Sequence, residues 1–178
     1  MAYFSAVTFR SPGTALMTQN LFTLENTTGS ARIVKIRRLS VQVDPTASLT
    51  TFMPLVKTSR TTAIPSGGTI LTKAVFDTAG VASVANVVAR GCNSSDGGGA
   101  SVITAIPYTV AWQQYCQRQY STAGQALGVD NDILSEIVVN YDLLLRANEA
   151  IVVQVVSPAP ISNPTTNNYV VNCVWEEV

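Results

Sequence analysis

Residues 31–45 read ARIVKIRRLSVQVDP, and the spacing of their apolar residues indicates a long β-strand. Its apolar residues fall into two sets of opposite parity, Val34 and Ile36 first, then Leu39, Val41 and Val43. The two faces of a strand alternate residue by residue, so the core-facing side must shift by one position between the sets. A β-bulge at Arg37–Arg38 would produce this shift, and Asp44–Pro45 would then end the strand.

The same stretch contains four of the chain's eleven basic residues, Arg32, Lys35, Arg37 and Arg38. Alternation alone places most of them on the outer face of the strand, and we favour that interpretation over a dedicated binding site. Formal net charge is zero, which argues against a nucleic-acid partner. Residues 1–75 nevertheless carry eight basic against two acidic residues, and the remainder three against nine.

Composition excludes several classes of protein. Only 12% of the residues are charged, which is typical of a surface meant to be covered by neighbours. There is no histidine, and the three cysteines, Cys92, Cys116 and Cys173, form no metal-binding motif, so we expect no metal, no cofactor and no enzymatic activity. We also expect neither a signal peptide nor a membrane span, and we expect the thiols to be free.

The rest of the chain is rich in valine and threonine and predicts an all-β protein. Strands are indicated at Leu21–Glu25, Leu49–Val56, Val102–Ile106, Tyr108–Cys116, Ile137–Leu145, Ile151–Val156 and Tyr169–Trp175. Residues 146–149 would join the fifth and sixth of these as a hairpin. One short helix, capped at Asp77 or Thr78 and stopped at Gly91, is predicted from valines at helical spacing.

These elements predict a jelly-roll-like β-sandwich with one short helix, and a barrel is the alternative. We expect residues 1–19 to form an extended N-terminal arm and residues 20–178 a single domain. The acidic segment DNDILSE (130–136) does not have the spacing of a calcium loop and is interpreted as a turn. Trp112, Tyr115 and Tyr120 could stack on a sugar, although the parity of residues 108–116 is typical of a core face.

Three segments carry a resemblance to a known group of proteins. They are RTTAIPSGGTILTKAVFDT (60–78), LLLRANEAIVVQV (143–155) and YVVNCVWEEV (169–178). Together they resemble small jelly-roll proteins encoded among the head genes of tailed bacteriophages, including capsid decoration, or cement, proteins. The second segment departs from the group's Leu-Arg-Pro-Gly-Glu-Gly pattern, because Ala147–Asn148 replaces Pro-Gly and Ala150 replaces the second glycine.

The resemblance implies a virion protein made in the bacterial cytoplasm and bound to the outside of the capsid. It would be a homo-oligomer, most often a trimer, whose partner is the major capsid protein and which binds neither nucleic acid nor a membrane. The basic residues Arg32, Lys35, Arg37 and Arg38, and Phe9 and Arg10 of the arm, are the candidate partner-binding residues. The alternative is a carbohydrate- or receptor-binding β-sandwich of a head fibre or tail appendage.

Overall fold

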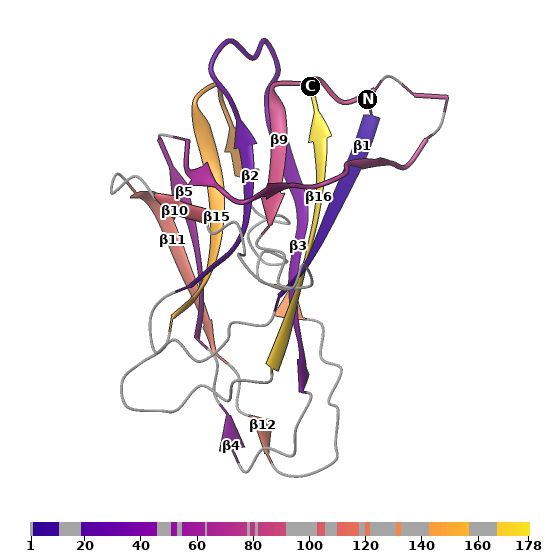
Figure 1. Ribbon diagram of the computed structural model, residues 1–178. Coiled ribbons are helices and arrows are strands. Elements are labelled where there is room, and N and C mark those ends of the chain that lie inside the picture. The colour runs from indigo at the N-terminus through magenta and orange to yellow at the C-terminus, as the bar shows by residue number, and fades with distance from the viewer. Residues whose placement is uncertain are drawn as a thin grey trace.

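The computed structural model describes residues 2–10, 19–45, 51–52, 55–62, 64–77, 79–80, 82–91, 103–105, 110–117, 120–121, 131–132, 143–156 and 167–178. Within these ranges the protein is all-β and its two main sheets are antiparallel. In Figure 1 the two sheets face each other, with β3, β16 and β1 on one side and β11, β5, β15 and β2 on the other. The predicted all-β class and the β-sandwich are confirmed at this level.

Sheet A has the order β13-β3-β16-β1-β8, and β14 also pairs with β3. Its strands are β13 (Asn131–Asp132), β3 (Val34–Pro45), β16 (Asn167–Glu177), β1 (Ala2–Arg10), β8 (Ala74–Val75) and β14 (Leu143–Leu145). The two ends of the chain lie side by side here, since Ala2 is opposite Glu177 in the β1–β16 pair (Figure 1).

Sheet B has the order β11-β5-β15-β2-β9-β7. Its strands are β11 (Val110–Gln117), β5 (Leu55–Thr61), β15 (Glu149–Val156), β2 (Gln19–Asn26), β9 (Val87–Gly91) and β7 (Thr69–Ile70). Two short pairs lie outside both sheets, β10 (Ile103–Ala105) with β6 (Ser66–Gly67), and β12 (Tyr120–Ser121) with β4 (Thr51–Phe52).

The bulge predicted in the opening stretch is confirmed. Val174 of β16 is opposite Arg38, but the next residue, Trp175, is opposite Ile36, so Arg37 is the extra residue in β3. The apolar side chains on both sides of the bulge are buried as a result: Val34, Ile36, Leu39 and Val41. The strand ends at Pro45, as its sequence predicts.

The first nine described residues do not form the expected arm. Ala2–Arg10 is β1, which pairs with β16 along its whole length and with β8 at Phe4 and Ser5. Phe4 and Ala6 are buried, and the Phe4 ring lies with its centroid 6.0 Å from that of Trp175. The outward residues Tyr3 and Val7 are apolar like the inward Phe4 and Ala6, which explains why the periodicity of this strand is weak in the sequence. Residues 11–18 of the predicted arm lie outside the described residues.

The predicted helix is also wrong over the described residues 82–91. A turn at Ala85–Asn86 leads into β9, and Val87 and Ala89 are buried while Val88 and Arg90 are only half-buried. Valines at positions 84, 87 and 88 fit a helical spacing, but valine prefers extended backbone, and pairing with β2 and β7 supplies the hydrogen bonds.

The turn at residues 146–149 forms, but it does not make a hairpin. Asn148 has a φ of 66°, and Glu149 donates its backbone N–H to Arg146 O. The strands on either side enter different sheets, because β14 pairs with β3 and β15 pairs with β2 and β5. The connection therefore crosses from sheet A to sheet B, and Asn148 N–H bonds to Asn26 O at 2.7 Å.

The core lies between the two sheets. Sheet A contributes Tyr169, Val171, Cys173 and Trp175, the set that the terminal segment predicts for one face, and all four are fully buried. Sheet B contributes Leu21, Phe22, Leu24, Ile151 and Val153. Cys173 is a free thiol, and burial raises its pKa well above the ordinary value.

Candidate functional site

Three of the predicted partner-binding residues lie on one surface, the outer face of sheet A. Lys35 precedes the bulge, Arg37 is the bulged residue and Arg38 follows it, and all three point away from the core residues of β3. Arg32 lies outside this face, in the loop before β3, where it is exposed. Phe9 and Arg10 lie at the end of β1, and their side chains are outside the described part of the structure.

A buried carboxylate anchors the basic end of this face. Glu176 in β16 has an outward parity but is fully buried, because the Arg37 guanidinium covers it. Arg37 Nε donates to Glu176 Oε2 at 2.9 Å, and Arg37 Nη2 donates to the same oxygen. The bulge thus has a second consequence: it turns an arginine onto the neighbouring strand's carboxylate.

Sequence reasoning missed the apolar part of the same face. Tyr3 and Val7 of β1 are 42% and 54% exposed, and Phe76, directly after β8, is 64% exposed. Phe76 N–H bonds to Tyr3 O at 3.0 Å, so these two residues are neighbours across the strand pair. The available signal was the alternation of residues 3 to 8, in which Phe4, Ala6 and Thr8 form the buried set.

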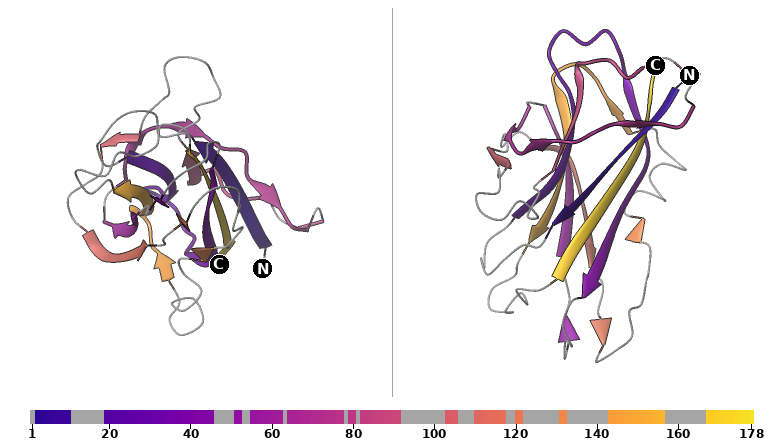
Figure 2. Two further views of the ribbon diagram at one scale, coloured as in Figure 1. Left: turned by 90° about the horizontal axis from the view of Figure 1, so that it is seen from below. Right: turned by 45° about the vertical axis from the view of Figure 1, so that its right-hand side comes forward.

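The strand register brings the apolar and basic groups into one continuous surface. Tyr3 is opposite Glu176, which is opposite Lys35, and Ser5 is opposite Val174, which is opposite Arg38. Each row therefore runs from the outward side of β1, across β16, to a cation on β3. Figure 2 shows β1, β16 and β3 side by side in its right-hand view.

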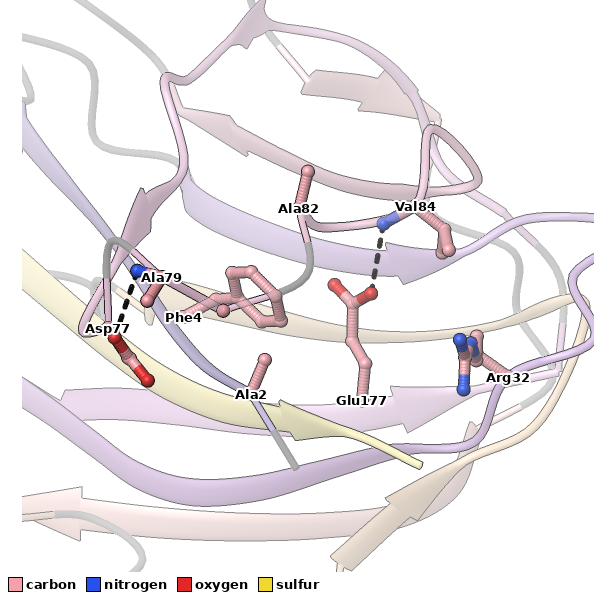
Figure 3. A pocket seen from close by; sticks show the side chains of 9 residues that line it. Ala2, Phe4, Arg32, Asp77, Ala79, Ala82, Val84 and Glu177 are labelled. Carbon is pink, nitrogen blue, oxygen red and sulfur yellow. Dashed lines mark hydrogen bonds between the residues drawn. The ribbon is translucent and has the colours of Figure 1, made fainter.

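A pocket of about 310 Å³ lies at the end of the sandwich where the two chain ends meet (Figure 3). Its lining includes Phe4, Arg32, Asp77, Val84 and Glu177. In Figure 3 the Glu177 side chain stands between Phe4 and Arg32 and points to the backbone of Val84. Asp77 accepts a hydrogen bond from Ala79 N–H at 3.0 Å, which closes a local turn at the rim.

The Glu177 carboxylate has a structural role in this pocket. It accepts hydrogen bonds from Val84 N–H at 3.0 Å, from Trp175 Nε1–H at 3.2 Å and from the Ser83 hydroxyl. Three donors on two segments account for most of the capacity of a carboxylate. Glu177 therefore ties the segment before β9 to the last strand of sheet A.

Lys73 strengthens the same connection. Its ammonium group donates to Val84 O at 2.9 Å and to Val87 O at 2.6 Å. Burial lowers the pKa of Lys73 from its ordinary value, and the nearby Glu177 carboxylate partly opposes this change. The lysine thus adds a donor to Val84 O, which also accepts from Val87 N–H, and supplies one to Val87 O, so it ties the turn before β9 together.

A second buried ion pair lies in sheet B. Glu25 of β2 is fully buried, and Arg90 of β9 reaches it with an Nε–Oε2 distance of 3.0 Å. The Thr23 hydroxyl donates to the other oxygen, Oε1, at 2.9 Å. This pair joins two neighbouring strands of sheet B, so it is not part of the outer face of sheet A.

The structure gives little information about the other candidate sites. Trp112 and Tyr115 lie in β11 and Tyr120 in β12, but their side chains are outside the described residues, as is most of the DNDILSE segment. No group of three or more His, Cys, Asp or Glu side chains that could hold a metal occurs in the part of the chain that is described. No helix among those residues is long and apolar enough to cross a membrane.

The chain was compared with protein-family models, with curated proteins and with solved structures, and none of the three comparisons found a match.

Proposed function

We propose that this protein is a virion structural protein that binds the outside of a tailed-bacteriophage capsid and stabilises it by clamping neighbouring capsid subunits. It would act by binding and not by turnover, with many copies each burying a modest surface and the lattice adding their contributions. A fold alone does not imply a function, so the proposal depends on the particular segments that resemble phage head proteins.

The observation that carries the proposal is where those segments lie. The terminal segment forms β16, the central strand of sheet A, and residues 143–155 supply β14 and most of β15, a central strand of sheet B. Residues 60–78 run from the end of β5 through β8 and so reach both sheets. The resemblance therefore involves the strands that build the sandwich, in addition to its turns.

We further propose that the sandwich is an eight-stranded jelly roll. In support, the first four principal strands pair in reverse order with the last four: β1 with β16, β2 with β15, β3 with β14, and β5 with β11. Rolling up one long antiparallel hairpin produces this pairing, and it is the arrangement of viral capsid and lectin jelly rolls. β7, β8 and β9 then extend the two sheets beyond β2 and β1.

Low charge density supports a surface that is covered in the assembled state. Only 12% of residues are charged, and immobilising short polar side chains costs little conformational entropy. We propose a homo-oligomer, with a trimer as the expected form, because a trimer presents three equivalent contacts to capsid subunits that meet around a point.

Cryo-electron microscopy of virions of the phage that encodes the chain tests the function. We expect density for the sandwich on the outer shell, where capsid subunits meet. Mixing the purified protein with heads that lack it should restore that density and raise the temperature at which the heads rupture. A shell without this density, together with heads that do not bind the added protein, would reject the proposal. Light scattering after size-exclusion chromatography tests the trimer.

A further inference from the structure

We draw no further inference here: the strongest candidate, the pocket of about 310 Å³ at the end of the sandwich, carries nothing because Glu177 already accepts three hydrogen bonds, Asp77 closes its own turn, and nothing in the described part of the structure shows which ligand a lining that combines Arg32 with these carboxylates would select.

Discussion

At the residue scale, the two sheets approach each other closely at Gly91. A Cβ atom built on Gly91 would lie 2.2 Å from Thr8 Oγ1 and 2.7 Å from Thr8 Cβ, so no side chain fits there. We expect Gly91→Ala to lower the free energy of unfolding by about 1–3 kcal/mol, the usual cost of overpacking. Urea denaturation measures the loss. Adding Thr8→Gly should recover part of it, and a Gly91→Ala protein as stable as the original would contradict the prediction.

Lys73 gives a residue-scale prediction that depends on pH. Burial lowers its pKa below the ordinary value of 10.5, which the unfolded chain retains. Between the lowered pKa and 10.5 the unfolded state binds more protons than the folded state, so stability from this residue rises with pH. We therefore expect the protein to gain stability over Lys73→Met as the pH is raised through that window. The other titrating groups are present in both proteins, so their effects cancel in the comparison. A difference in unfolding free energy that shrinks as the pH rises would contradict the prediction.

At the element scale, the Glu25–Arg90 pair connects β2 to β9. Glu25 is fully buried and Arg90 is 25% exposed. Among the described residues, removing the arginine leaves the buried carboxylate with the Thr23 hydroxyl as its one side-chain donor. We expect Arg90→Met to destabilise the protein by about 3 kcal/mol. The double variant Glu25→Met with Arg90→Met should recover most of this loss, because both charges are then gone. Equal losses in the single and double variants would show that packing, and not the unpaired charge, dominates.

Elements also show where sequence reasoning succeeds and where it fails. The bulge at Arg37 was predictable because the change from even-numbered to odd-numbered apolar residues is visible within one short stretch. In a strand, such a change means that the core-facing side has shifted by one residue. The segment 82–91 was misassigned because its valines fit two periods, and the pairing with β2 that selects the strand is not visible locally. The turn at 146–149 was predictable from Asn148, but not that its two strands enter different sheets.

At the scale of the whole molecule, the candidate surface was only half predictable. Its cations lie in one stretch of sequence, so the basic half could be found by reading along the chain. The apolar half is assembled from Tyr3 and Val7 of β1 and from Phe76, and these two distant segments meet only because β1 pairs with β8. A surface built from two distant segments has no signature within either one. The reverse-order pairing of the principal strands could not be predicted for the same reason. Each pair joins a strand from the first half of the chain to one from the second half, so no single segment indicates it.

The N-terminal strand supplies the last prediction, because an arm and a strand respond differently to removal. β1 lies between β16 and β8 and buries Phe4 and Ala6 in the core. Deleting residues 2–10 would expose the edge of β16 and one side of Trp175, which packs on Phe4. We therefore expect the truncated protein to lose its cooperative thermal transition and to bind a hydrophobic dye, as measured by near-UV circular dichroism and dye fluorescence.

The control for this truncation keeps β1 and changes only its outward residues, Tyr3→Ser and Val7→Ser. Both are exposed in the isolated chain, so the change should leave the transition nearly intact. The contrast separates the two faces of the strand, since its inward side chains are buried in the core and its outward side chains Tyr3 and Val7 are exposed. A truncated protein that still melts cooperatively at the original temperature would mean that residues 2–10 behave as an arm, so that their pairing with β16 contributes little to stability.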